Sequence, residues 1–162
     1  MVENLIYMLE RIKHFLAYSE WTIPRIVSGL LTMPNGPEDA LRPFAHLLLA
    51  EKTWLMRLRA EDSSVVNLEE RLSTPQCERL ALENQKGYAD FVSGVSEHSL
   101  AAIVKYKNTK GLHFETPVVD ILLHVVIHGA YHRGQIASAI RRAGGTPQNT
   151  DYISYLREHP VR

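Results

Sequence analysis

The apolar residues of this chain recur at steps of three and four over long segments. This spacing places apolar side chains on one face of an α-helix. The pattern is clearest near the N-terminus, at Leu5, Met8, Ile12, Phe15, Ile23, Ile26 and Leu30. Because such a helix is stabilised mainly by covering its apolar face with other elements, the chain is expected to fold as helices packed around a shared core.

Turn-forming residues divide the sequence into four long helices. Met33-Pro34-Asn35-Gly36-Pro37 separates the first from the second, and Gly144-Gly145 supplies a stop after the fourth. Thr74, which precedes a proline, is the predicted N-cap of the third. The second, third and fourth helices are predicted at about 37–60, 74–94 and 116–140, and one or two further turns are predicted after residue 150.

A different pattern precedes the last long helix. Residues 102–106 and 112–115 are rich in β-branched and aromatic side chains and flank Asn108-Thr109-Lys110-Gly111, which predicts two short strands about a turn. No linker long enough to separate two domains is present in the sequence. We therefore predict an all-α four-helix bundle with a small β-hairpin before the last long helix, forming one domain over 1–162.

Charge and cysteine content narrow the functional classes. Eighteen basic and eighteen acidic side chains balance, so the sequence lacks the broad positive field typical of nucleic-acid binding proteins. The single cysteine, Cys77, cannot form an internal disulfide, which suits a reducing compartment. No run approaches the roughly 20 apolar residues of a membrane span. We expect a cytoplasmic protein with neither a membrane nor a nucleic-acid partner.

Histidines at steps of four mark the fourth predicted helix. His124, His128 and His132 follow Asp120 at this spacing. Residues four apart on a helix lie about 6 Å apart along its axis, so two neighbouring imidazoles can share one metal ion. The first and third histidines lie about 12 Å apart along the axis and cannot. The spacing leaves His124/His128 and His128/His132 as alternative pairs.

A third ligand is expected from the second helix. His46 lies in the apolar segment Ala45-His46-Leu47-Leu48-Leu49-Ala50, where an uncompensated imidazole would be costly to bury. The spacing excludes a zincin, because neither histidine pair contains the glutamate of His-Glu-x-x-His. Three imidazoles suit zinc, nickel, copper or iron(II) and leave coordination positions for water or substrate; zinc and nickel are the cofactors we expect.

A known motif covers the same histidines. The segment from His128 through Ile136, His-Gly-Ala-Tyr-His-Arg-Gly-Gln-Ile, closely resembles the HxxxHRGQ signature of the DinB-like family. The resemblance extends over nearly the whole chain. It includes Tyr18-Ser19-Glu20-Trp21, the pattern His46…Glu51…Trp54, Gly145-Thr146-Pro147 and Asp151-Tyr152.

The resemblance implies a four-helix bundle, often a homodimer, with one divalent metal on His46, His128 and His132. His124 then becomes a neighbouring pocket residue. It further implies a metal-dependent hydrolase or a thiol-dependent S-transferase acting on a small molecule, with a low-molecular-weight thiol as partner in the second case. The alternative is a non-catalytic, stress-associated binding protein in which the metal site is structural or sequesters a ligand. The sequence identifies no catalytic residue beyond the ligands.

Overall fold

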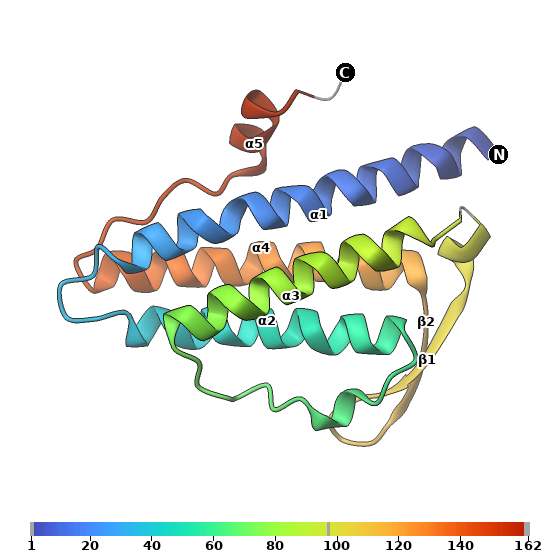
Figure 1. Cartoon of the computed structure of the whole chain (residues 1–162), viewed down its shortest axis with the longest axis horizontal. Coiled ribbons are helices and arrows are strands. Elements are labelled where there is room, and N and C mark those ends of the chain that lie inside the picture. Colours follow the sequence, from blue (N-terminus) through green and yellow to red (C-terminus); the bar gives the residue numbers. More distant parts are fainter. Residues whose placement is uncertain (1, 97, 161–162) are drawn as a thin grey trace.

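Four long helices lie along one another and form a bundle in the computed structural model, which describes residues 2–96 and 98–160, with side chains from Tyr7 onward (Figure 1). They are α1 (Val2–Leu30), α2 (Glu38–Leu58), α3 (Thr74–Ser93) and α4 (Val118–Arg142). The shorter elements are the 3-10 helices η1 (Ser63–Val65) and η2 (His98–Ala101), the strands β1 (Ile103–Lys107) and β2 (His113–Pro117), and α5 (Tyr152–Glu158). The predicted bundle and hairpin are both confirmed.

Each long helix packs against two others. α2 contacts α3 and α4, and α1 contacts the same two helices from the other side. The antiparallel hairpin joins α3 to α4 at the end of the bundle where α2 ends (Figure 1). Arg57 of α2 holds the hairpin there by donating a hydrogen bond to the backbone carbonyl of Lys107 at 3.2 Å. Within the described residues, no helix is long and apolar enough to cross a membrane.

The N-cap of α3 and the start of α4 differ from the prediction because of local hydrogen bonding. The N-cap of α3 is Ser73 rather than Thr74, because the Ser73 backbone N–H donates to Gln76 Oε1 at 2.8 Å in a capping box. α4 begins at Val118 rather than near residue 116, because Thr116 and Pro117 pair with β1 as the last residues of β2.

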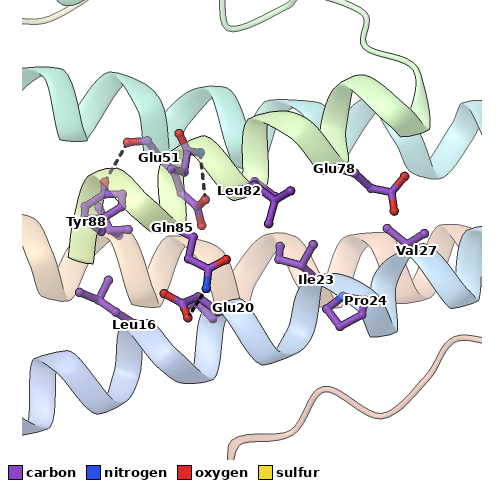
Figure 2. Close-up of a pocket in the computed structure, with 14 residues that line it drawn as sticks. Leu16, Glu20, Ile23, Pro24, Val27, Glu51, Glu78, Leu82, Gln85 and Tyr88 are labelled. Atoms are coloured by element: carbon purple, nitrogen blue, oxygen red, sulfur yellow. Dashed lines mark hydrogen bonds between the residues drawn. The ribbon is translucent and has the colours of Figure 1, made fainter. Parts of the chain in front are cut away.

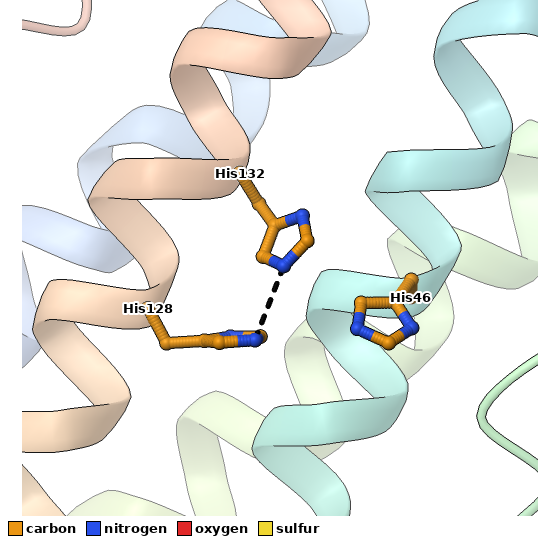
Figure 3. A group of neighbouring side chains, drawn as sticks. All are labelled: His46, His128 and His132. Carbon is orange, nitrogen blue, oxygen red and sulfur yellow. Dashed lines mark hydrogen bonds between the residues drawn. The ribbon is translucent and has the colours of Figure 1, made fainter.

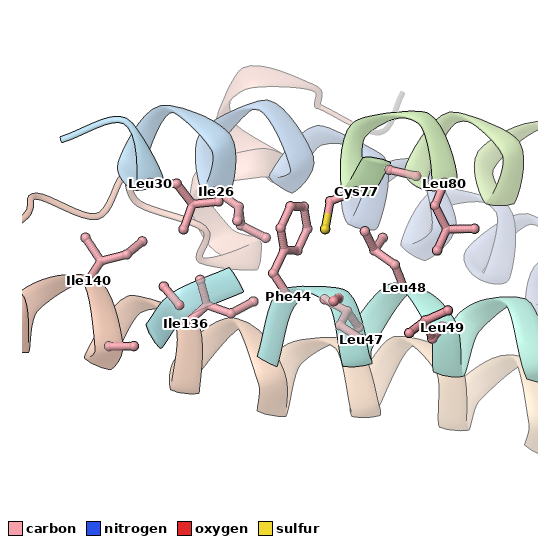
Figure 4. Packing of buried hydrophobic residues seen from close by; sticks show 14 of the residues in the cluster. Ile26, Leu30, Phe44, Leu47, Leu48, Leu49, Cys77, Leu80, Ile136 and Ile140 are labelled. Atoms are coloured by element: carbon pink, nitrogen blue, oxygen red, sulfur yellow. The ribbon is translucent and has the colours of Figure 1, made fainter. Parts of the chain in front are cut away.

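The interior consists of two apolar clusters with polar side chains between them. One cluster surrounds Phe44, which is fully buried (Figure 4), and the other surrounds Leu122 nearer the hairpin. Along every long helix, polar residues lie between the positions that belong to the two clusters. This middle layer contains Tyr18 and Thr22 of α1, Glu51 of α2, Asn84 of α3, and His132 and Arg133 of α4. The polar layer crosses the bundle at the level of the predicted metal ligands.

Candidate metal centre

His128 and His132 project from adjacent turns of α4 and face each other. Their Nε2 atoms lie 3.1 Å apart, and the ring centroids are 4.3 Å apart. His132 is buried, and His128 is half-buried at the surface of α4. The four-residue spacing therefore brings two ring nitrogens to one point beside α2, as the sequence predicted.

His46 completes the group from the facing helix (Figure 3). Its ring centroid lies 4.9 Å from that of His132 and 5.8 Å from that of His128. His46 Nδ1 donates a hydrogen bond to the Leu68 carbonyl at 3.2 Å, which fixes the tautomer and leaves Nε2 as the free lone pair. One ring nitrogen from each of the three histidines lies within 4.8 Å of the others.

The nitrogen spacing fits a transition metal. Zinc–nitrogen bonds of 2.0–2.1 Å at a tetrahedral angle separate two ligand nitrogens by roughly 3.3 Å, close to the separation between His128 and His132. One ring nitrogen of His46 lies within 4.8 Å of those two nitrogens. The donor set of three imidazoles is one that zinc and nickel accept.

The two imidazoles of α4 lie in surroundings that favour the neutral form, which is the form that binds metals. Burial lowers the pKa of His128 to about 4, and three neighbouring imidazoles add to the effect. Burial and the nearby His46 likewise lower the pKa of His132, while a contact with the Gln135 side chain acts in the opposite direction. Both lowered pKa values favour uncharged His128 and His132 side chains at neutral pH.

His124 lies outside this group. It is exposed, and its ring packs edge-on against Trp54 with centroids 4.9 Å apart. Its centroid is 5.5 Å from that of His128, so it borders the site without joining the three clustered nitrogens. Asp120 is exposed one turn earlier and, among the described residues, makes no hydrogen bond to His124. Of the two alternative pairs, the structure brings together the one that includes His132.

A groove opens beside the histidines. It has a volume of about 280 Å³ and is lined by His46 and His132, by Arg42 and Gln135, and by the loop residues Glu69 and Glu70. Arg42 pairs with Glu69 at 3.2 Å, and both side chains are exposed. Sequence reasoning did not identify these loop carboxylates, because residues 59–73 carry no helical or strand periodicity that would place them.

Cys77 has no part in this site. It is fully buried in the Phe44 cluster on α3. Burial raises the pKa of its thiol to about 11, and Glu78 contributes to the same direction. A thiol in this environment is protonated at neutral pH and is not a nucleophile.

Comparisons with known proteins define the class. Residues 37–160 match the family model described as DinB family, so the chain belongs to the DinB family. It is 29% identical over 120 residues to Protein DinB of Bacillus subtilis (strain 168), an alignment covering 69% of each protein. A DinB-like protein from Bacillus cereus ATCC 10987 has the same fold, with a TM-score of 0.58, 19% identity, and coverage of 86% of this chain and 95% of that one.

Proposed function

We propose that this protein is a metal-dependent enzyme that holds a divalent transition metal, zinc or nickel, on His46, His128 and His132. The observation that carries the proposal is the convergence of three imidazole nitrogens, within 4.8 Å of one another, beside an open groove that His46 and His132 line. Structural zinc sites normally have four protein ligands and are closed. Three ligands beside a groove instead favour a site that accepts water or substrate.

A metal bound there would lower the pKa of a coordinated water or thiol and produce a nucleophile at neutral pH. Side chains and backbone groups of the protein would orient the histidines and accept the proton. The Leu68 carbonyl holds His46 in one orientation, and Gln135 lies against His132 at the rim. The Glu69 and Glu70 carboxylates are candidates to accept a proton in the groove, a role that neither histidine pair supplies within its own motif.

The same groove offers a binding group for substrate. The Arg42 guanidinium is exposed and carries five N–H donors, so it can exchange its contact with Glu69 for a carboxylate on a substrate or on a small thiol. This arrangement supports two reaction classes: hydrolysis, in which water is the nucleophile, and S-transfer, in which a thiolate attacks an electrophile.

The test compares both reactions in protein reconstituted with zinc or nickel. Hydrolysis is followed with p-nitrophenyl acetate, and S-transfer with monobromobimane and a panel of low-molecular-weight thiols. We expect the metal-loaded wild type to accelerate at least one reaction over free metal. His132→Ala should lose that acceleration, whereas His113→Ala, on the exposed hairpin, should keep it. Wild-type protein that binds metal but accelerates neither reaction would contradict the proposal of an enzyme of these classes.

A further inference from the structure

A second cavity, separate from the histidine groove, lies between α1 and α3 (Figure 2). Its volume is about 250 Å³, and it shares no lining residue with the groove. Glu51 reaches it from α2. Because Glu51 follows His46 by five residues, the two side chains point about 140° apart around the helix axis. A molecule in this cavity would not contact the three histidines.

The walls of this cavity are mainly apolar. They are formed by aliphatic side chains from α1, α3 and α4: Leu16, Ile23, Val27, Leu82 and Val125. Leu82 is an exposed apolar side chain among these lining residues, with 66% of its surface accessible. Covering such a surface with an apolar ligand would be favourable, at about 25 cal/mol for each Å² removed from water.

The acidic side chains that line the cavity have no basic counterpart in its lining. Glu20, Glu51 and Glu78 line it, and no lysine or arginine does. Asn84 Nδ2 donates to Glu51 Oε2 at 3.3 Å, and Gln85 Nε2 donates to Glu20 Oε2 at 2.9 Å (Figure 2). Among the described residues, the Asn84 amide is the one side chain that hydrogen-bonds to the Glu51 carboxylate.

Arg133 is the cation whose charge acts on the Glu51 carboxylate, but it does not contact that carboxylate directly. Its guanidinium lies over the Tyr18 ring, 4.7 Å from the ring centroid, and the described residues show no ion pair between Arg133 and Glu51. A half-buried carboxylate without a direct counterion is energetically unfavourable, and a cationic ligand would reduce that cost. An anion would be repelled by three carboxylates.

We propose that this cavity binds a small organic cation with an apolar body, whose ammonium group pairs with the Glu51 carboxylate. The apolar part would lie against the aliphatic walls between α1 and α3. This site differs from the metal site in position, in charge and in ligand class, and it does not depend on the proposed enzyme activity.

Three probes of one shape and different charge test the proposal on the full chain: phenethylamine, phenethyl alcohol and hydrocinnamate. Binding is measured by isothermal titration calorimetry near pH 8, and the site is located from amide chemical shifts. We expect phenethylamine to bind about tenfold more tightly than the alcohol, as a charge-assisted hydrogen bond allows, and hydrocinnamate to bind more weakly than both. The largest shift changes should fall on Ser19, Asn84 and Gln85.

Two variants complete the test. Glu51→Gln keeps the size of the side chain and should reduce phenethylamine binding about tenfold, to the level of the alcohol. Glu83→Gln removes a carboxylate from the exposed surface of α3, outside the cavity, and should leave binding unchanged. Equal affinity for amine and alcohol, undiminished amine binding in Glu51→Gln, or shift changes confined to the histidine groove would each overturn the proposal.

Discussion

Replacement of Glu51 by glutamine should stabilise the protein, and only above mildly acidic pH. Burial raises the pKa of the Glu51 carboxyl from 4.5 to about 7, while the hydrogen bond from Asn84 and the charge of Arg133 act in the opposite direction. The folded state therefore holds a proton that the unfolded chain releases at lower pH. As pH rises from about 4.5 to about 7, the wild type should lose stability, because the folded state must either retain that proton or bury a charge.

The size of the effect follows from the pKa difference. The rise of the Glu51 pKa from 4.5 to about 7 corresponds to about 3 kcal/mol, which is the upper limit of the destabilisation by Glu51 above pH 7. Glutamine has nearly the same volume and can keep the contact with Asn84 but carries no titrating group. Glu51→Gln should thus match the wild type near pH 4.5 and exceed it by up to about 3 kcal/mol near pH 8.

Urea unfolding of both proteins, measured at intervals between about pH 5 and pH 8, gives the difference in free energy of unfolding at each pH. Other titrating groups are common to both proteins and cancel in this difference. Glu83→Gln serves as the control and should follow the wild type throughout. A difference between Glu51→Gln and wild type that does not change with pH, or that favours the wild type at high pH, would refute the reasoning.

Three further substitutions test the packing around the site. Phe44→Ala removes a fully buried ring from the larger apolar cluster and should lower the free energy of unfolding by about 3–5 kcal/mol in urea unfolding. Arg57→Met removes the hydrogen bond to the Lys107 carbonyl and the stacking on Trp54; amide hydrogen exchange of the hairpin should accelerate, and unchanged exchange would argue against this anchor. Tyr18→Phe removes the hydrogen bond from the Tyr18 hydroxyl to the Thr150 carbonyl, at 2.7 Å, and should cost about 1 kcal/mol, measured by thermal unfolding.

Much of the fold could be predicted from the sequence because helical periodicity and turn residues are local signals. The four long helices and the hairpin are where the apolar spacing and Asn108-Thr109-Lys110-Gly111 placed them. The errors fell at helix starts. Ser73 caps α3 through a hydrogen bond with Gln76, and Pro117 belongs to strand β2. Both features depend on partner residues, which the helix propensity of a single residue cannot specify.

The sequence predicted only part of the candidate site, because the spacing of the histidines is a local signal and the facing of the helices is not. Spacing on one helix showed that two of three histidines could share an ion, but it could not show which pair faces α2. That depends on how α4 is rotated in the bundle, and the structure turns His132 inward and His124 toward Trp54.

Glu51 and the groove carboxylates were not predicted as parts of a site. Glu51 lies among apolar residues of α2, where no pattern distinguishes a carboxyl facing a cavity from an exposed one. Glu69 and Glu70 lie in a loop whose course is set by packing against His46 and α2. Sites of this kind bring together side chains from separate helices and loops, so they cannot be located before the tertiary structure is known.

Metal content, measured by elemental mass spectrometry on purified protein reconstituted with zinc or nickel, tests the central claim most directly. The wild type should hold close to one ion per chain. His46→Ala, His128→Ala and His132→Ala should each lose it, because only two imidazoles remain. His124→Ala should retain it, since its ring lies outside the clustered nitrogens. A wild type that binds no ion after reconstitution, or a His46→Ala variant that keeps its ion, would contradict the assignment of these three histidines as a metal centre.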